Sequence, residues 1–255
     1  MIRVAGATKQ FGSRLALDRF DLDVACGEVV ALIGPNGAGK STALRILAGV
    51  LRPTAGSATI TGYDVQREGP AARRHVGYLP QRLGVPASTV LGDLADLVAA
   101  VRGVPALDAT RALGEVGVGD RLGATLAQLS GGQRQRAMLA LAMLGGPAAL
   151  VLDEPSISLD SEGAEEVRGA IRRARASGVA VLFASHHLHD VAALADRIVV
   201  MVGGRAVAQG TLPELAAAAG VPWSSAAADA PIDRIYRTLV SRGRGAIPHI
   251  GRSAA

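Results

Sequence analysis

Six short apolar runs, rich in β-branched residues, constrain the fold of this chain more than any other feature. They cover residues 29–33, 58–61, 76–79, 150–152, 179–184 and 198–202. Most of these runs are continuous rather than alternating, which is typical of strands buried on both faces of a parallel sheet. Residues 40–50 and 90–101 place apolar side chains at helical spacing between the strands. The pattern predicts an α/β fold with helices packed over a mainly parallel sheet.

The strand pattern is interrupted in the middle of the chain. Residues 82–146 read as almost wholly helical. We therefore expect one domain over residues 1–215, in which this stretch forms a helical insert on the α/β core. After residue 215 the composition shifts to Ala, Gly, Pro and Ser, and a short helical pattern follows at 232–240. Residues 216–255 are interpreted as a short Ala/Arg-rich C-terminal extension.

Composition limits the class of protein. A chain of 255 residues with 49% hydrophobic residues can bury a core, which excludes disordered and fibrous classes. Cys26 is the single cysteine, and the sequence opens without a charged-then-apolar leader pattern, so a reduced, cytoplasmic setting is expected. The longest uncharged apolar stretch, at 137–152, is shorter than the roughly 20 residues that a bilayer span needs.

The charge balance is basic. A formal net charge of +5 admits nucleic acid, an anionic membrane surface or a phosphorylated ligand as a partner. Among the 27 basic residues only Lys9 and Lys40 are lysines, which makes an isolated lysine worth attention. The C-terminal extension carries arginines that fit either a solvated surface or contact with acidic headgroups or a partner.

A glycine-rich loop follows the first apolar run and precedes an amphipathic stretch. It consists of Gly34, Pro35, Asn36, Gly37, Ala38, Gly39, Lys40, Ser41 and Thr42, and matches G-x-x-x-x-G-K-[ST]. Its glycines let successive N–H groups converge on phosphate oxygens, and the following helix adds the positive end of its dipole. Lys40 can reach the β- and γ-phosphates, and the Ser41 hydroxyl can bind Mg²⁺. The loop predicts a site for a nucleotide phosphate.

Two carboxylates end the apolar run at 150–152. Asp153 and Glu154 stand where open α/β sheets place ligands, and neighbouring strand residues face opposite ways, so the two can divide roles. Asp153 is expected to hold Mg²⁺, and Glu154 to polarise a water for attack on the γ-phosphate.

A second anion-binding helix terminus is predicted further along the chain. Ser130, Gly131, Gly132 and Gln133 open a long helical pattern, with Ser130 as the expected N-cap. One nucleotide seldom needs two such termini from one subunit, so this one is expected to serve a nucleotide held by another copy.

Over residues 2–210 these motifs resemble those of the ATP-binding-cassette (ABC) ATPases. Residues 129–133 resemble the signature sequence of that family. Phe11 is similar to the aromatic that stacks on adenine, and Gln81 to the glutamine where the core meets the helical domain. Asp160 is similar to the aspartate of the loop that crosses the dimer interface, and His186 to the histidine that senses the γ-phosphate. The resemblance implies a P-loop NTPase core with a mainly parallel sheet, an antiparallel N-terminal β part and a helical insert.

The resemblance also implies roles for individual residues. The residues implied to be catalytic are Glu154, His186, Lys40 and Gln81. Those implied to bind Mg²⁺ are Ser41, Gln81 and Asp153. ATP is then held by Phe11 and residues 34–42, and by Ser130, Gly131, Gly132, Gln133 and Asp160 of another copy. Two positions depart from the family pattern: Ser156 occupies a position where Thr is usual, and Ser158 one where Gly is common. We expect Ser158 to alter the backbone freedom of its loop.

Three of the five histidines crowd together, at His186, His187 and His189. A metal site is the alternative interpretation of this cluster. Their spacing by itself specifies no carboxylate-plus-histidine geometry, so the metal site is set aside, and His187 and His189 are expected to be surface helix residues.

The resemblance implies partners as well. One phosphate loop and one signature per chain require a homodimer, or a pair with a paralogous cassette, around two MgATP. A separate integral-membrane permease would hold the chain at the inner face of the cell membrane, and the short C-terminal extension favours export over import. The alternative is an ABC ATPase not coupled to transport, in assembly or with nucleic acid. An aromatic content of 3% and scattered arginines argue against nucleic acid.

Overall fold

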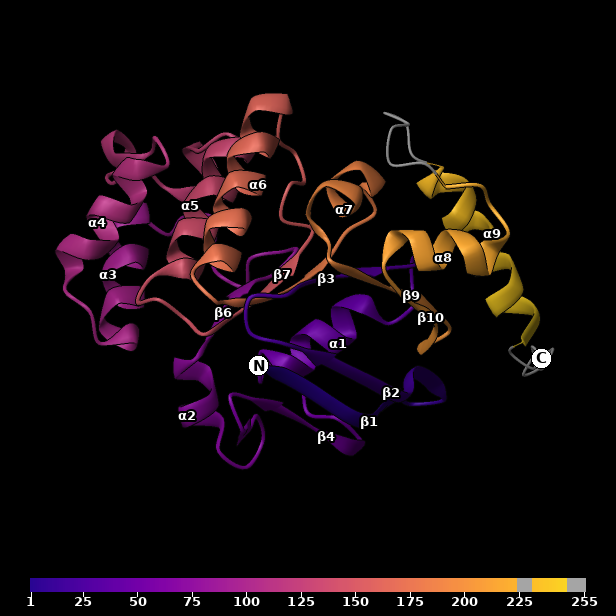
Figure 1. The fold of residues 1–255 in the computed structure, drawn as a ribbon. Coiled ribbons are helices and arrows are strands. Elements are labelled where there is room, and N and C mark those ends of the chain that lie inside the picture. The colour runs from indigo at the N-terminus through magenta and orange to yellow at the C-terminus, as the bar shows by residue number, and fades with distance from the viewer. Residues whose placement is uncertain (224–230, 247–255) are drawn as a thin grey trace, which may run out of the picture.

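The structure is a computed structural model, and it describes residues 1–223 and 231–246. Its larger sheet has six strands in the order β10-β9-β3-β8-β7-β6 (Figure 1). These are β10 (Arg205–Gly210), β9 (Arg197–Val202), β3 (Val29–Ile33), β8 (Ala180–Ala184), β7 (Ala149–Asp153) and β6 (Val76–Leu79). Every neighbouring pair is parallel except β9 with β10, which is antiparallel. The predicted mainly parallel α/β sheet is confirmed.

The central strands are continuous apolar runs because both of their faces are covered. Every residue of β3, β7 and β8 is buried. Ala31 and Ile33 belong to an apolar layer shared with helices α5 (Gly131–Met143), α6 (Ser161–Ala176) and α7 (Leu188–Leu194). Val30 and Leu32 belong to a second layer, shared with α1 (Lys40–Leu47) and the N-terminal strands. Successive side chains point to opposite faces of a strand, so one short run builds both layers.

The smaller sheet is antiparallel and lies beside α1 (Figure 1). Its order is β2 (Arg14–Val24), β1 (Ile2–Phe11), β4 (Ala55–Ile60) and β5 (Tyr63–Asp64). The last residues of β2 alternate between buried and exposed, as expected of a strand with one face on the core. A search for continuous apolar runs therefore missed β1 and β2. The antiparallel N-terminal part implied by the family resemblance is confirmed.

A helical insert separates β6 from β7, as predicted. It contains α3 (Leu91–Arg102), α4 (Ala106–Glu115), the short 3-10 turns Gly119–Arg121 and Leu126–Gln128, and α5. Helix α3 buries Leu91, Leu94, Ala95 and Ala99, which recur at helical spacing, while Leu97 and Val101 remain 59% and 74% exposed. The insert therefore presents apolar side chains on its surface as well as in its core.

Two C-terminal helices complete the fold. Helix α8 (Leu212–Ala219) ends at Gly220, whose φ of 69° suits a left-handed C-cap. Helix α9 (Ile232–Ala246) is longer than the predicted 232–240. Both helices contribute buried residues to the layer that covers β9. The domain boundary expected after residue 215 therefore falls within α8, which packs on the cassette. Within residues 1–223 and 231–246, no helix is both long and apolar enough to cross a membrane.

Candidate active site

The phosphate loop joins β3 to α1, as the sequence predicts. Gly39 lies in the left-handed region, with φ of 106°, directly before the first residue of α1. A Cβ on Gly39 would lie 2.6 Å from the carbonyl oxygen of Ala16, so both the backbone angle and the available space require glycine. The loop is thereby pressed against β2, and the N-terminus of α1 opens at Lys40 toward the ligand side.

Lys40 lies across the loop. Its Nζ donates to the carbonyl oxygen of Gly34 at 2.6 Å and to that of Pro35 at 3.3 Å. Burial lowers the pKa of this ammonium, while the nearby carboxylates of Glu154 and Asp153 act in the opposite direction. A half-buried ammonium near two carboxylates is suited to bind the negatively charged oxygens of a phosphate.

Asp153 ends β7 and is only 2% exposed. Burial raises the pKa of its carboxyl, and the hydrogen bond with Ser41 acts against that shift. Its Oδ2 is buried and has no hydrogen-bond partner in the described part of the chain. A buried carboxylate oxygen without a partner, beside a serine hydroxyl, fits the oxygen donor set that Mg²⁺ prefers.

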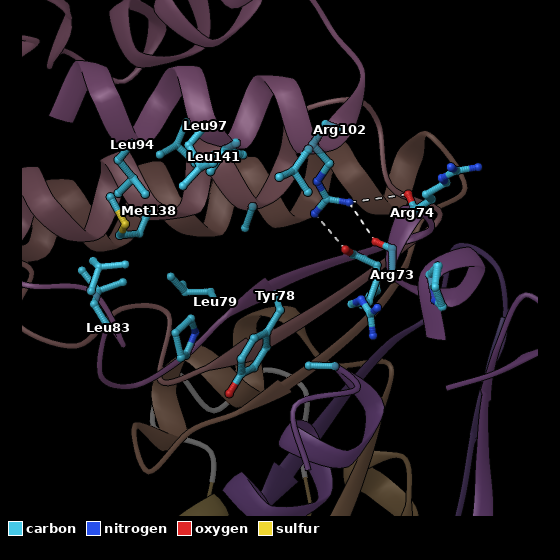
Figure 2. Close-up of a pocket in the computed structure, with 18 residues that line it drawn as sticks. Arg73, Arg74, Tyr78, Leu79, Leu83, Leu94, Leu97, Arg102, Met138 and Leu141 are labelled. Carbon is cyan, nitrogen blue, oxygen red and sulfur yellow. Dashed lines mark hydrogen bonds between the residues drawn. The ribbon is translucent and has the colours of Figure 1, made fainter. Parts of the chain in front are cut away.

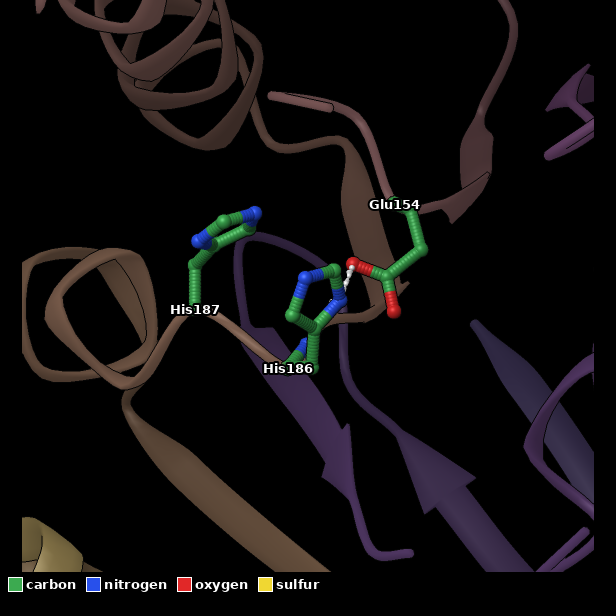
Figure 3. Close-up of side chains that lie close together, drawn as sticks. All are labelled: Glu154, His186 and His187. Carbon is green, nitrogen blue, oxygen red and sulfur yellow. Dashed lines mark hydrogen bonds and ion pairs between the residues drawn. The ribbon is translucent and has the colours of Figure 1, made fainter. Parts of the chain in front are cut away.

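Glu154 follows Asp153 at the same sheet edge and contacts His186, which follows β8 (Figure 3). Oε2 of Glu154 lies 2.8 Å from Nδ1 of His186 and accepts the backbone N–H of His186 at 3.3 Å. Glu154 has a φ of 56°, unusual for a residue other than glycine, and its own N–H donates to the carbonyl of Ala184 at 2.9 Å. The strained backbone is held by the neighbouring strand, as is common for residues at reactive sites.

A third donor lies beside this pair. Atoms of Glu154, His186 and His187 that could bind a metal all lie within 4.8 Å of one another. His187 is the N-cap residue of α7 rather than a residue within the helix, whereas His189 lies in α7 and is exposed. The spacing of the histidines along the chain indicated no carboxylate ligand beside them. In the fold, Glu154 lies beside His186 and His187 because β7 and β8 are neighbouring strands.

A cavity of about 200 Å³ gathers most of the predicted hydrolytic residues. It is lined by Asn36, Gly37, Ala38, Gly39, Lys40, Ser41, Thr42, Gln81, Asp153 and Glu154, together with Arg14 and Ala16 of β2. Phe11 lies outside this lining. It is 48% exposed at the end of β1, pairs in register with Arg14 and has the Nζ of Lys9 5.0 Å from its ring centroid. The hairpin of β1 and β2 thus carries a half-exposed aromatic ring and, beside the loop, an arginine.

The signature residues lie apart from this cavity. Ser130 caps α5, since its Oγ accepts the N–H of Gln133 at 3.1 Å and its own N–H donates to Oε1 of Gln133 at 3.0 Å. A Cβ on Gly131 would lie 3.3 Å from the Cβ of Ser158, so the signature packs against the segment that follows Asp153 and Glu154. Asp160 caps α6 by accepting the N–H of Gly163 at 2.9 Å. None of these residues lines the cavity that holds Lys40 and Glu154.

Two residues of the site region were missed by sequence reasoning. Arg14 has its guanidinium beside Gly37, and Gln135 donates from Nε2 to the carbonyl oxygens of Glu154 at 3.3 Å and Pro155 at 2.8 Å. Gln135 thereby joins α5 to the segment that follows β7. Neither residue belongs to a local motif, and only the folded chain brings them to the site.

A larger, apolar groove of about 580 Å³ lies between the helical insert and the core (Figure 2). Leu94, Leu97, Met138, Leu141, Leu79 and Leu83 are among its lining residues. Arg102 lies at one end, where it donates to the carbonyl oxygens of Val76 at 2.8 Å and Arg73 at 3.2 Å. Arg73 belongs to α2 (Gly69–Arg74), so Arg102 joins the insert to the core. Burial lowers the pKa of Arg102.

The fold and the cavity together define a P-loop nucleoside triphosphatase with a helical insert. The family model of ABC transporters matches residues 17–157, more than half of the chain. The daunorubicin resistance ATP-binding protein DrrA3 of Streptomyces coeruleorubidus is 40% identical over 226 residues, which cover 86% of this chain and 71% of that protein. The zinc import ATP-binding protein ZnuC of Roseobacter denitrificans is 36% identical over 219 residues, which cover 86% and 81%.

The solved structures agree with this result. A structure of the ATP-binding subunit of an ABC transporter superposes with a TM-score of 0.84 and 27% identity, over 94% of this chain and 99% of that one. The chain therefore belongs to the ABC transporter family, and it is an ABC ATPase.

Proposed function

We propose that this chain is the ATP-hydrolysing subunit of a transporter, and that Glu154 is the base that activates water. The observation that carries the proposal is the buried Glu154 carboxylate, held against His186 at the rim of the cavity that contains Lys40. Glu154 accepts the proton of the attacking water, and Lys40 binds the β- and γ-phosphate oxygens. His186 lies against Glu154 outside the cavity lining, and we assign it a contact with the γ-phosphate, whereas Gln81 lines the cavity itself.

Mg²⁺ fits the oxygen atoms at the end of β7. It would be held by Ser41, Asp153 and Gln81. Oδ2 of Asp153, which has no hydrogen-bond partner among the described residues, would be the main anionic donor. When bound, Mg²⁺ neutralises charge on the phosphate oxygens. Lys40 supplies a further positive charge in the same cavity, which also favours a triphosphate.

Two copies are proposed to sandwich two ATP molecules. Support comes from the separation within one chain of the cavity and the signature, since a helix N-terminus capped by Ser130 is left to serve a nucleotide on the other copy. Asp160, the N-cap of α6, is assigned to the same interface. The pair is a homodimer or includes a paralogous cassette.

Dimerisation can be tested in Glu154→Gln, which keeps the shape of the side chain but removes the base. Light scattering with saturating MgATP is expected to show a dimer for Glu154→Gln and a monomer when Lys40→Ala is added. A Glu154→Gln protein that stays monomeric under conditions where it binds MgATP would contradict the sandwich.

The groove beside the insert is proposed to receive a cytoplasmic helix of a separate membrane permease, which would place the chain at the inner face of the cell membrane. Its apolar lining and the exposed Leu97 and Val101 fit the apolar face of a helix. The arginines at one end, Arg73, Arg74 and Arg102, fit an acidic residue on that helix.

Co-expression with a candidate permease, meaning a multi-span membrane protein whose gene is found to adjoin the gene of this chain, tests the docking site. Leu97→Glu is expected to abolish co-purification while leaving the ATPase activity of the isolated chain unchanged. Leu107→Glu is a matched control, because Leu107 is 64% exposed on α4 and lies outside the groove lining. Equal loss of binding in both variants would contradict the assignment.

Export remains our prediction for the direction of transport, and the daunorubicin resistance relative supports it. The zinc import relative is nearly as similar, so the direction needs its own measurement. In inside-out vesicles that contain the chain and its permease, an exporter is expected to accumulate cargo on addition of ATP, whereas an importer would release it.

A further inference from the structure

The end of β8 brings two imidazoles to a buried carboxylate. His186 Nδ1 lies 2.8 Å from Glu154 Oε2, and the rings of His186 and His187 have centroids 4.0 Å apart (Figure 3). Donor atoms of all three residues lie within 4.8 Å of one another. The proposed hydrolysis assigns roles to Glu154 and His186, and it assigns none to His187.

The donor set favours a late transition metal over Mg²⁺. Two imidazole nitrogens with one carboxylate oxygen suit Zn²⁺ and its neighbours, whereas Mg²⁺ prefers oxygen donors such as those of Ser41 and Asp153. Zn²⁺ bonds of about 2.0–2.1 Å in a tetrahedron place neighbouring donor atoms about 3.3 Å apart. Glu154 and His186 are already close to that separation. His187 must approach by no more than about 1.5 Å.

The surroundings of the three side chains allow the small approach that a metal ion requires. Glu154 is buried and fixed by its backbone bond to Ala184, so it provides a stationary ligand. The His186 side chain is 54% exposed and His187 is also exposed, so both rings can turn toward the carboxylate. The backbone beneath them is held, since the N–H of His187 donates to Oγ of Ser185 at 3.0 Å. Three protein ligands leave a fourth position for water.

We propose that Glu154, His186 and His187 form a transition-metal site, and that Zn²⁺ bound there stops ATP hydrolysis. A metal ion held by Glu154 occupies the lone pair that must accept the proton of the attacking water. It also draws the imidazole of His186 away from the γ-phosphate. Inhibition is therefore reversible by a chelator and depends on His187, which the hydrolytic reaction does not need.

Two readouts test the site, and the second does not depend on activity. All proteins carry Cys26→Ala, because an exposed thiol would itself bind the metal. ATP hydrolysis is measured with excess Mg²⁺ over a Zn²⁺ titration, followed by EDTA with fresh Mg²⁺. Separately, nucleotide-free protein is titrated with Co²⁺, and its visible absorption is recorded.

His187→Ala is the main variant and His189→Ala is the matched control, three positions from His186 and exposed on α7. His187→Ala is expected to hydrolyse ATP as the unchanged protein does. Half inhibition of this variant should need at least about tenfold more Zn²⁺, because the loss of even a residue that only supports a metal ligand lowers metal affinity by about that factor. The Co²⁺ absorption should weaken in His187→Ala and in Glu154→Gln, and persist in His189→Ala.

The outcomes separate this proposal from the proposed function, on which the inhibitory effect rests. Unchanged Zn²⁺ sensitivity and Co²⁺ absorption in His187→Ala would overturn the site, as would a protein that binds no Co²⁺. An equal effect of His189→Ala would also overturn it. If the chain hydrolyses no ATP but binds Co²⁺ through His187, the metal site stands and the proposed hydrolysis fails.

Discussion

The hydroxyl of Ser156 donates a hydrogen bond to Oδ2 of Asp190, and this bond joins the segment after Glu154 to helix α7. Oδ1 of the same carboxylate accepts from Nη1 of Arg168, on α6, at 2.6 Å. Asp190 and Arg168 have side chains that are only 9% and 11% exposed. One buried carboxylate therefore ties together α6, α7 and the loop that leads to Asp160.

Removal of Arg168 is expected to destabilise the cassette strongly. Arg168→Met leaves the Asp190 carboxylate buried without its cationic partner, which should lower the free energy of unfolding by about 3 kcal/mol. Arg172→Met is the control, because Arg172 pairs with Glu165 but is 48% exposed, and it should cost less than about 1 kcal/mol. Urea unfolding of both variants measures the difference. Equal losses would show that Asp190 needs no buried cation.

A double variant checks the electrostatic cause. Adding Asp190→Asn to Arg168→Met removes the charge that has lost its partner, so part of the stability should return. A further loss of stability in the double variant would instead assign the effect to packing of the Arg168 stem.

Replacement of Glu154, the proposed base, should separate nucleotide binding from hydrolysis. Glu154→Gln retains the shape of the side chain and a donor or acceptor toward His186, but its amide accepts no proton from water. We expect the turnover number to fall by about 100-fold or more while MgATP still binds. Steady-state hydrolysis and nucleotide titration measure the two effects. Hydrolysis close to that of the unchanged protein would exclude Glu154 as the base.

Asp153 should lower the stability of the nucleotide-free protein. Burial raises the pKa of its carboxyl in the folded state, so the native protein binds a proton more tightly than the unfolded chain. Stability contributed by the protonated form is then lost as the pH rises from the ordinary aspartate pKa through the raised one. Above this window a buried charge remains, with Oδ2 unpartnered in the described residues.

Asp153→Asn should therefore stabilise the nucleotide-free protein at neutral pH. The gain is on the order of 1 kcal/mol, or about 2–4 °C in melting temperature for a domain of this size. The same variant should lose the further increase that MgATP gives to the unchanged protein. Thermal unfolding at several pH values, with EDTA and then with MgATP, checks both results. A lower melting temperature of Asp153→Asn in EDTA would contradict the role of desolvation.

The parts of the fold that the sequence predicted well are local. Residues 34–42 are consecutive, and their glycines and Lys40 specify a turn and a helix start without reference to the rest of the chain. Strands β3, β7 and β8 are buried on both faces, so their composition alone marks them. Helix α5 and its Ser130 cap follow from a capping box of four residues.

The parts that the sequence did not predict depend on distant pairing. Strand β1 lies between β2 and β4, and its side chains alternate too irregularly to mark it as a strand. Arg14 reaches the phosphate loop only because the β1–β2 hairpin folds over it. Glu154 meets His187 because β7 and β8 are neighbours in the sheet, a pairing that no spacing along the chain encodes.

The backbone at Ser158 carries a strain that glycine would relieve. Ser158 has a φ of 64°, in the left-handed region, which costs a residue with a side chain roughly 1–2 kcal/mol. Glycine avoids that cost but gains freedom in the unfolded chain, worth roughly 0.5–1 kcal/mol. Ser158→Gly is therefore expected to raise the free energy of unfolding by up to about 1.5 kcal/mol. Ser158→Ala keeps the strain and should give no such gain, and a urea titration that found equal gains would assign the effect to the hydroxyl instead.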